Sequence, residues 1–318
     1  MPESATQPRA EPSLVRLRAG NVARMSDTHS ATLVPGEIAA EVLDVLDQRG
    51  QVDPISNRLS GLDLASAYDV AAAVRRLRQG RGERVVGRKI GFTNTTIWAE
   101  YGVHAPIWGY VYDTTLHSLA DLDGRFDLSS TVEPRIEPEI MFGLARSPEP
   151  DMDERALVSC IEWAAHGFEI VQSIFPGWRF TAADTVVAFG LHGALLVGPR
   201  VPISAETAVC WQSALSSFDS ALMRNGELVD EGRASNVLGG GPLAALRHLV
   251  EVLAADPTAP RLGEGEIVST GTLTRALPVS AGETWATQLS GIPLPGVTVR
   301  FNSEADVSRL SESRRSKP

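Results

Sequence analysis

The chain is poor in cysteine and almost free of lysine. Its two cysteines, Cys160 and Cys210, lie among apolar residues without metal-site spacing, so we expect reduced, buried thiols rather than a disulfide or thiol chemistry. Of the 29 basic residues only Lys89 and Lys317 are lysines, and Lys317 belongs to a polar tail. Because arginine serves almost wherever a positive charge is needed, Lys89 indicates a task that arginine performs poorly.

Long apolar runs and clustered positive charge are also absent. No stretch of about 18 apolar residues occurs, and the N-terminal residues lack the apolar segment of a secretory signal. The net charge of -10 argues against nucleic-acid binding, which needs clustered lysine and arginine. We therefore expect a cytoplasmic globular protein without a membrane or nucleic-acid partner, in which an anionic substrate needs a local cation.

The hydrophobic pattern divides the chain into four segments. Polar, aperiodic ends flank a helical lobe and a β-rich body: a disordered extension over 1–34, an N-terminal helical lobe over 35–84, a catalytic domain over 85–302 and a disordered tail over 303–318. Met25 is an alternative start. Helical spacing of apolar residues predicts the two helices of the lobe, Gly36–Arg49 and Leu62–Leu77.

The body consists of short β-rich stretches separated by glycine, proline and aspartate. We predict strands over Val85–Phe92, Trp108–Tyr112, Arg135–Leu144, Phe168–Val171, Gly193–Val197, Leu215–Arg224, Glu227–Asp230, Glu266–Ser269, Glu283–Leu289 and Gly296–Phe301. Helices are predicted over Glu154–Ala165 and Pro242–Ala254, and Asn225-Gly226 predicts a type I′ hairpin turn. Without a regular βαβ alternation, the pattern favours an α+β fold built on a curved, largely antiparallel sheet.

Two glutamates, Glu137 and Glu139, lie two residues apart in a β-rich stretch and therefore project from the same face of a strand. Alone, such a pair is more typical of the solvated face of an edge strand, and Pro138 suits an edge or distorted strand. A third glutamate, Glu169, has apolar neighbours that make an unpaired charge costly. Three carboxylates without nearby cysteine favour Mg²⁺ or Mn²⁺ over zinc.

Lys89 lies between apolar residues and glycines in the stretch Val85–Phe92. An ammonium group changes its pKa readily on burial and can act as an acid or receive a carboxylate, whereas a guanidinium stays protonated. The alternative is an ordinary exposed lysine. The scarcity of lysine favours a functional role.

Other candidates carry weaker indications. His104 and His192 lie near glycines in predicted loops, where a structural hydrogen-bonding role is the commoner one. The glycine run before Pro242 could offer amides to an anion, although a plain turn is more common. The segment Thr270–Thr272 supplies hydroxyls and amides for a carboxylate. The chain lacks the motifs of serine hydrolases, P-loop NTPases and dinucleotide-binding proteins.

Several segments, in this order, resemble the 2-keto-4-pentenoate hydratase and 4-oxalocrotonate decarboxylase family of the fumarylacetoacetate hydrolase superfamily. They lie within Gly36–Phe301 and comprise Val86–Thr93, Gly102–Gly109, Pro134–Ile140, Phe168–Val171, Val237–Gly239 and Val297–Phe301. The resemblance implies a mixed β-sandwich roll with an N-terminal helical lobe, a homo-oligomer, and Mg²⁺ or Mn²⁺ chelated by the 2-oxo and carboxylate oxygens of a small 2-oxo acid.

The resemblance also implies residue roles. It assigns metal ligation to Glu137, Glu139 and Glu169, and an acid/base or carboxylate-binding role to Lys89. With these residues we expect a metal-dependent lyase that works through a metal-stabilised dienolate, either as a hydratase or as a decarboxylase. A superfamily hydrolase or tautomerase and a non-catalytic binding member are the alternatives. A decarboxylase of the family can pair with a hydratase of its pathway.

Departures from the family pattern affect the substrate side. Ile107 stands where hydratases carry an aspartate and decarboxylases an aliphatic residue, which favours decarboxylation. Gln172-Ser-Ile and Ala188-Phe replace more polar residues of the family, which favours a substrate other than that of the standard catechol pathway. We predict substrate contacts from Gly91, Ile107, Gln172, Thr270, Gly271 and Thr272.

Overall fold

The computed structural model describes residues 34–303 and residue 306. The predicted disordered ends, 1–34 and 303–318, lie outside the described residues except at Val34, Ser303 and Asp306. All described residues belong to one compact unit. The division of this unit at residue 85 into a lobe and a catalytic domain stays a prediction. Within the described part, no helix is long and apolar enough to cross a membrane.

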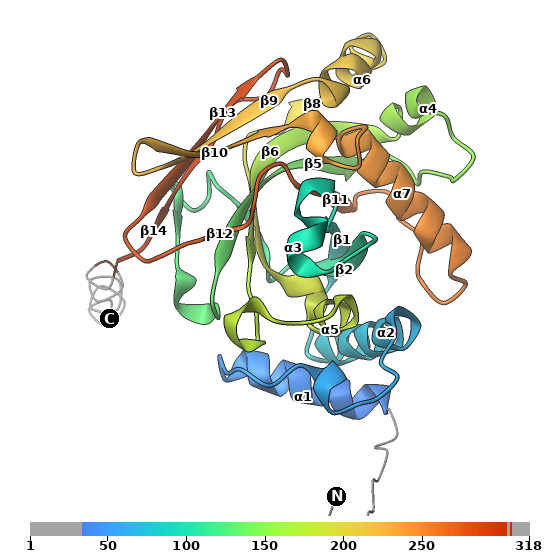
Figure 1. Ribbon diagram of the computed structural model, residues 1–318. Coiled ribbons are helices and arrows are strands. Elements are labelled where there is room, and N and C mark those ends of the chain that lie inside the picture. Colours follow the sequence, from blue (N-terminus) through green and yellow to red (C-terminus); the bar gives the residue numbers. More distant parts are fainter. Residues whose placement is uncertain (1–33, 304–305, 307–318) are drawn as a thin grey trace, which may run out of the picture. The chain divides into compact units, whose positions relative to one another are not determined.

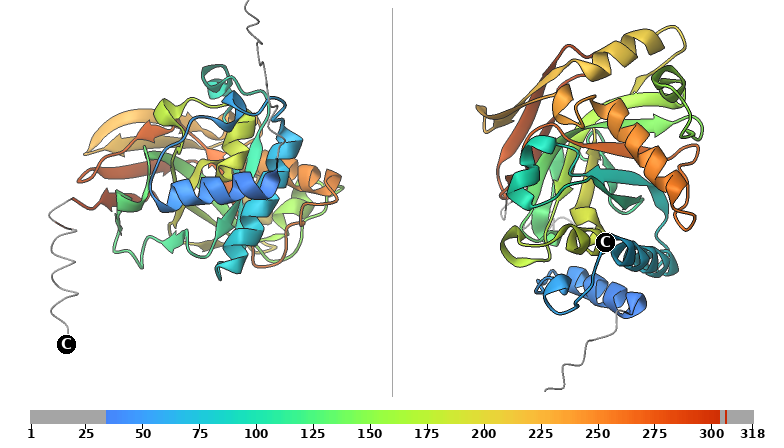
Figure 2. Two further views of the ribbon diagram at one scale, coloured as in Figure 1. Left: turned by 90° about the horizontal axis from the view of Figure 1, so that it is seen from below. Right: turned by 45° about the vertical axis from the view of Figure 1, so that its right-hand side comes forward.

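Two N-terminal helices, α1 (Pro35–Asp47) and α2 (Leu64–Gly80), pack against each other and against α5 (Ala182–Val187) (Figure 1). Both helices agree closely with the predicted ones. A capping box fixes the start of α2, where the Asp63 carboxylate accepts the Ser66 amide and Ser66 Oγ accepts the Asp63 amide. Figure 2 shows α1 and α2 side by side from two further directions.

A nine-stranded, mostly antiparallel sheet forms the body of the fold. Its order is β2 (Ile107–Tyr112), β1 (Val85–Gly91), β11 (Ile267–Thr272), β5 (Arg135–Leu144), β6 (Ile161–Val171), β7 (His192–Val197) and β3 (Leu116–Ser118), with β12 (Leu277–Pro278) paired to β5 and β8 (Val201–Pro202) to β6. Only the pairs β1–β11 and β3–β7 are parallel among these strands. The prediction of a largely antiparallel α+β fold is confirmed.

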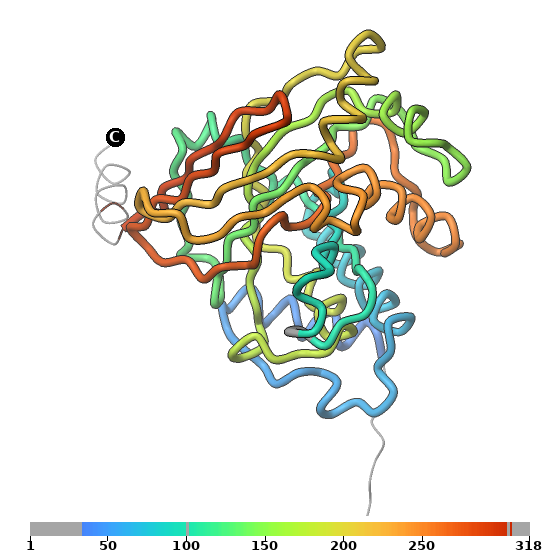
Figure 3. The backbone as a smooth tube through the Cα atoms, turned by 45° about the horizontal axis from the view of Figure 1, so that its top comes forward, coloured from blue at the N-terminus to red at the C-terminus, as the bar shows by residue number. Residues whose placement is uncertain are grey.

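A second, five-stranded sheet lies against the first. Its order is β10 (Glu227–Arg233), β9 (Asp219–Arg224), β13 (Thr284–Ser290), β14 (Thr298–Phe301) and β4 (Arg125–Phe126). Figure 3 shows the β9–β10 and β13–β14 segments side by side although they are far apart in sequence. Phe168 and Leu196 of the first sheet pack with Trp285 and Val299 of the second, which makes a sandwich core.

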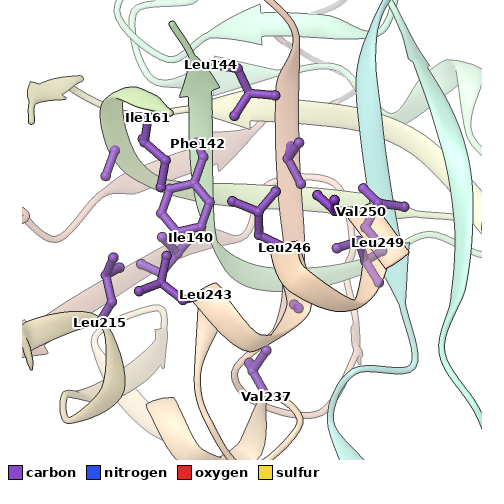
Figure 4. Packing of buried hydrophobic residues seen from close by; sticks show 14 of the residues in the cluster. Ile140, Phe142, Leu144, Ile161, Leu215, Val237, Leu243, Leu246, Leu249 and Val250 are labelled. Carbon is purple, nitrogen blue, oxygen red and sulfur yellow. The ribbon is translucent and has the colours of Figure 1, made fainter. Parts of the chain in front are cut away.

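Further helices cover another part of the large sheet. They are α4 (Glu154–Val158), α6 (Ala208–Ser216) and α7 (Pro242–Ala255), whereas the short α3 (Trp98–Tyr101) follows β1. Ile140 and Phe142 of β5 pack against Leu243 and Leu246 of α7 (Figure 4). Because side chains alternate along a strand, this face of β5 is apolar while Glu137 and Glu139 project from the other. Core packing thus fixes the direction of the carboxylates.

Some sequence predictions were wrong. The helix expected over Glu154–Ala165 ends at Val158, and Ile161 begins β6, because pairing of β6 with β5 and β7 outweighs its alanine-containing local sequence. The strand expected from Leu215 begins only at Asp219, because Leu215 belongs to α6. Cys160 is buried as expected, but Cys210 is exposed, since α6 turns Trp211 and Leu215 inward instead.

The edge-strand alternative for the two glutamates was also wrong. β5 lies between β11 and β6 in the middle of the sheet. Pro138 is accommodated next to an interruption of the β5–β11 ladder between Ser269 and Thr272, where its carbonyl accepts the Leu273 amide at 3.0 Å. The predicted turn at Asn225-Gly226 is confirmed, with φ of 53° and 88°.

Candidate metal centre

Strand pairing brings three glutamates together. Glu137 on β5 lies directly opposite Glu169 on β6, and Glu139 follows on the same face of β5. One carboxylate oxygen from each lies within 4.8 Å of the others. Glu139 and Glu169 are fully buried and Glu137 is partly exposed. A buried cluster of like charges is unfavourable unless a cation balances it.

The Glu139 carboxylate is held by β11. Its Oε2 accepts hydrogen bonds from Ser269 Oγ and from the Gly271 amide at 3.0 Å. Gly271 has a φ of 94°, and a Cβ there would lie 1.8 Å from Thr93 Oγ1, so only glycine fits. The predicted residue Gly271 therefore orients a candidate ligand through its backbone.

The Glu169 carboxylate has a different partner at each oxygen. Oε1 lies 2.8 Å from His192 Nδ1, and Oε2 lies 3.3 Å from Lys89 Nζ. Lys89 Nζ also donates to the Gly190 carbonyl at 2.9 Å. A Cβ at Gly91 would come within 3.3 Å of the ammonium, so this glycine leaves room beside it. Lys89 is 2% exposed, so the alternative that it is an ordinary exposed lysine is wrong.

Burial and mutual repulsion shift the pKa values of the groups in this cluster. Burial raises the pKa of Glu137 and Glu139 to about 8, with a further increase from neighbouring carboxylates and an opposing effect of Lys89. Burial also raises the pKa of Glu169, against the attraction of Lys89. Burial alone would lower the pKa of Lys89, but the three carboxylates outweigh it and raise that pKa. One ammonium faces three carboxyl groups, so without a further cation they cannot all ionise favourably, which is why their pKa values are raised.

The donor set fits a hard divalent cation. Within the described residues, Glu139 Oε1 and Glu169 Oε2 are buried and accept no hydrogen bond. Such orphaned oxygens are costly unless an ion meets them. All the candidate ligands are carboxylate oxygens, which suit Mg²⁺ or Mn²⁺ better than soft metals. The residues present are thus able to hold such an ion.

A pocket opens beside Lys89 and Glu137. It is lined by Lys89, Gly91, Phe92, Ile97, Ile107, Glu137, Val171, Trp178, Gly190, Leu191 and Ala276. Lys89 and Glu137 are the charged residues of this lining, and the remainder is apolar or glycine. Of the predicted substrate contacts, Gly91 and Ile107 belong to it. They face one another on β1 and β2, on the same side of the sheet as Lys89.

Other predicted contact residues lie outside this lining. Gln172 Oε1 accepts the Val132 amide at 3.2 Å, Thr270 Oγ1 donates to the Ile140 carbonyl at 2.8 Å, and Thr272 Oγ1 donates to the Thr274 carbonyl at 3.0 Å. Backbone groups therefore engage these side chains, and their role in substrate binding stays a prediction.

The two histidine candidates differ in their surroundings. His104 is exposed. His192 is buried, with Nδ1 at 2.8 Å from Glu169 Oε1 and Nε2 at 2.8 Å from Thr115 Oγ1. Burial lowers the pKa of His192 well below its usual value, and Lys89 lowers it further, so the ring is neutral.

The glycine run before Pro242 has a packing role. Gly241 has a φ of 83°, and a Cβ there would lie 2.3 Å from the Leu215 carbonyl oxygen. Pro242 then begins α7 as predicted. These contacts agree with a plain turn before the helix.

Sequence reasoning missed Ser269 and Trp178. Trp178 lines the pocket with a φ of 59°, donates Nε1–H to the Glu133 carbonyl at 3.0 Å, and has the Arg135 guanidinium 4.0 Å from its ring. The Pro-Gly-Trp turn was the available indication of Trp178. Nothing local distinguishes Ser269, because its contact with Glu139 depends on the pairing of β11 with β5.

Comparison with known proteins extends over most of the chain. No family model matches it. A 4-oxalocrotonate decarboxylase of Pseudomonas sp. (strain CF600) is 28% identical over 261 residues, which cover 81% of this chain and 92% of that protein. A 2-keto-4-pentenoate hydratase of Burkholderia vietnamiensis (strain G4) is 28% identical over 270 residues, 84% of this chain and 97% of that protein.

A solved structure is similar to this chain over most of its length. The 4-oxalocrotonate decarboxylase from Pseudomonas putida G7, complexed with magnesium and adipate, superposes with a TM-score of 0.75 at 25% identity. The match covers 85% of this chain and 99% of that one. Since a decarboxylase and a hydratase are equally similar in sequence, these likenesses do not separate the two reactions.

Proposed function

Because the chain belongs to the 2-keto-4-pentenoate hydratase and 4-oxalocrotonate decarboxylase family of the fumarylacetoacetate hydrolase superfamily, we propose that it is a Mg²⁺- or Mn²⁺-dependent lyase acting on a small 2-oxo acid. The observation that carries the proposal is the buried cluster of Glu137, Glu139 and Glu169, with Lys89 beside it. Glu139 Oε1 accepts no hydrogen bond from the described residues, and Glu169 Oε2 has only the Lys89 ammonium at 3.3 Å, so both oxygens have capacity left for an ion.

Glu137, Glu139 and Glu169 would hold the ion. When bound, it supplies a Lewis acid beside the 2-oxo and carboxylate oxygens of the substrate. The apolar pocket next to Glu137 excludes water and receives the carbon chain. This arrangement supports a reaction in which electrons move toward the 2-oxo group.

Lys89 would handle the proton and the substrate's charge. The surrounding carboxylates keep its pKa raised, so the group is a cationic donor at neutral pH. It lies in the pocket lining within reach of both Glu169 and the Gly190 carbonyl. We assign it to binding the substrate carboxylate or to delivering a proton to the carbon chain.

The apolar lining favours decarboxylation over hydration. A carboxylate group loses its negative charge when it leaves as CO₂. Apolar surroundings disfavour the charged carboxylate more than neutral CO₂, so they promote its loss. Ile107 and Leu191 supply such surroundings beside Lys89. Water addition also needs a base to activate the water, and among the described lining residues Glu137 is the one carboxylate, already a candidate metal ligand, while Lys89 is protonated. Hydration remains the alternative because a hydratase relative is equally similar.

A hydrolase of the superfamily is less well supported. Such an enzyme would need a histidine free to activate water beside the metal. Both ring nitrogens of His192 are engaged, and the residue does not line the described pocket. Membership of the family also supports two proposals about assembly. The chain would form a homo-oligomer, and as a decarboxylase it would have a hydratase of the same pathway as its partner.

An assay with two substrates tests the proposal. The purified full-length protein is incubated with Mg²⁺ or Mn²⁺ and either 4-oxalocrotonate or 2-hydroxypenta-2,4-dienoate, while CO₂ release and dienol absorbance are followed. We expect CO₂ release that EDTA abolishes and that Glu139→Gln lacks. Loss of the dienol without CO₂ would make the protein a hydratase. Inactivity with both substrates, with no metal bound, would overturn the proposal.

A further inference from the structure

His192 lies behind the candidate metal centre rather than in the pocket. It is the first residue of β7 and is 3% exposed. Its ring bridges the Glu169 carboxylate and the Thr115 hydroxyl, with both contacts at 2.8 Å. Pairing of β7 with β6 and with β3 brings these three residues together.

The partners of the ring define which nitrogen carries the proton. An ionised carboxylate only accepts hydrogen bonds, so Nδ1 is the protonated nitrogen that donates to Glu169 Oε1. Nε2 then has a free lone pair and accepts from the Thr115 hydroxyl. The Thr115 hydroxyl also accepts the Tyr112 amide at 3.3 Å and lies 3.1 Å from the Tyr112 carbonyl, so its proton is shared between that carbonyl and His192 Nε2, and the Glu169 contact is the one that fixes the tautomer.

This hydrogen bond separates the two oxygens of Glu169. Oε1 is occupied by His192, while Oε2 is buried, accepts no hydrogen bond from the described residues and lies 3.3 Å from Lys89 Nζ. The carboxylate cannot rotate to present both oxygens without breaking its bond to His192. The free oxygen is therefore the one that faces the other candidate ligands.

We propose that His192 is a positioning residue that holds Glu169 as a ligand through one oxygen. The inference rests on the proposed metal site. A hydrogen-bonded partner behind a ligand fixes its orientation and keeps it basic, and loss of such a partner typically weakens metal binding about 10–100-fold. His192 acts through Glu169 and does not touch the pocket.

Three substitutions at this position separate positioning from packing. Asparagine places its amide near the position of Nδ1 and keeps the donor to Glu169, whereas glutamine places its amide near Nε2. Leucine fills space without either hydrogen bond. The experiment measures Mn²⁺ binding to the full-length variants by electron paramagnetic resonance of the free ion, without substrate.

We expect His192→Leu and His192→Gln to weaken Mn²⁺ binding about 10–100-fold, and His192→Asn to retain most of the affinity. Thr115→Val, which removes the donor to Nε2, should weaken binding less than His192→Leu. Equal affinity in all variants, or a loss in His192→Asn as large as in His192→Leu, overturns the proposal.

Glu139→Gln distinguishes this failure from failure of the metal site itself. If Glu139→Gln abolishes binding while His192→Leu does not change it, the site stands and the role of His192 is wrong. If Glu139→Gln also binds Mn²⁺ normally, the proposed site is wrong. Should His192→Leu fail to fold, the comparison of His192→Asn with His192→Gln and the Thr115→Val variant decide in its place.

Discussion

Two consecutive basic residues of β1 face opposite sides of one sheet and have opposite surroundings. Arg88 lies over the rings of Tyr110 and Trp108, at 4.4 and 5.8 Å from their centroids, with Glu266 Oε1 at 3.3 Å. Lys89 faces the glutamate cluster and the pocket. Both are almost fully buried. Burial of a charge alone therefore does not distinguish a functional site from a structural one.

The balance of charge distinguishes them. On the Arg88 side cations are matched by carboxylates and aromatic faces: Arg78, like Arg88, has both, since it pairs with Glu83 at 2.6 Å and lies over Tyr112. Such planar, permanently charged groups suit stacking and paired contacts. On the Lys89 side three carboxyl groups share one ammonium, and in the described structure two of their oxygens, Glu139 Oε1 and Glu169 Oε2, accept no hydrogen bond. An excess of buried acidic groups over basic ones, with raised pKa values, indicates a site for a cation.

The largest expected effect comes from removing one of the three carboxyl groups of the glutamate cluster. Glu139→Gln keeps the shape of the side chain but should reduce Mg²⁺ affinity by more than the roughly 10–100-fold loss of an outer partner, and abolish turnover. The metal-free variant should nevertheless be more stable at neutral pH, by about 2 kcal/mol, since glutamine has no carboxyl group that must take up a proton on folding. Calorimetric titration and thermal unfolding with EDTA check both effects. An unchanged Mg²⁺ affinity would show that Glu139 is not part of a metal site.

The next effect tests whether Lys89 could be an arginine like its neighbours. Lys89→Arg retains the positive charge, but a guanidinium does not release a proton and needs more room than Gly91 and Gly190 leave. We expect kcat to fall by about 10²–10⁴, the usual contribution of a proton donor. Steady-state kinetics at saturating Mg²⁺ measure it. A near-normal rate would show that Lys89 supplies only charge.

The same comparison shows what could be predicted from the sequence. Alternation along a strand places Glu137 and Glu139 together, and the scarcity of lysine identifies Lys89, because both depend on local pattern. The placement of Glu169 opposite Glu137 depends on the register of β6, which pairs on both sides with distant strands. For the same reason local sequence predicted a helix over the start of β6, and the hydrogen bond of His192 could not be foreseen.

A smaller effect is expected on the balanced side of the sheet. Arg88→Lys keeps the charge but loses the planar stacking on Tyr110 and Trp108, so the free energy of unfolding should fall by about 1–2 kcal/mol. Metal affinity should not change, since Arg88 faces away from Glu139. Chemical denaturation and Mg²⁺ titration measure the two properties. Weakened Mg²⁺ binding without lost stability would contradict the separation of the two faces.

A further effect, gradual over several pH units, is the pH dependence of metal binding. In the metal-free protein the pKa values of Glu137 and Glu139 are raised from 4.5 to about 8, so both keep protons at neutral pH. Mg²⁺ must displace these protons, and its apparent affinity should rise up to about tenfold per pH unit and per proton until the pH passes the raised pKa.

The linked effect on stability has the opposite sign. A carboxyl group whose pKa is higher in the folded state stabilises the metal-free fold fully below pH 4.5, and this stability is lost as the pH rises through about 8. Added Mg²⁺ should therefore raise the melting temperature most above that pH. Titration calorimetry in buffers of different ionisation enthalpy counts the released protons. On Mg²⁺ binding, Arg88→Lys should release as many protons as the unaltered protein, and Glu139→Gln should release fewer. An affinity that does not change with pH would mean that Glu137 and Glu139 are already ionised in the metal-free protein.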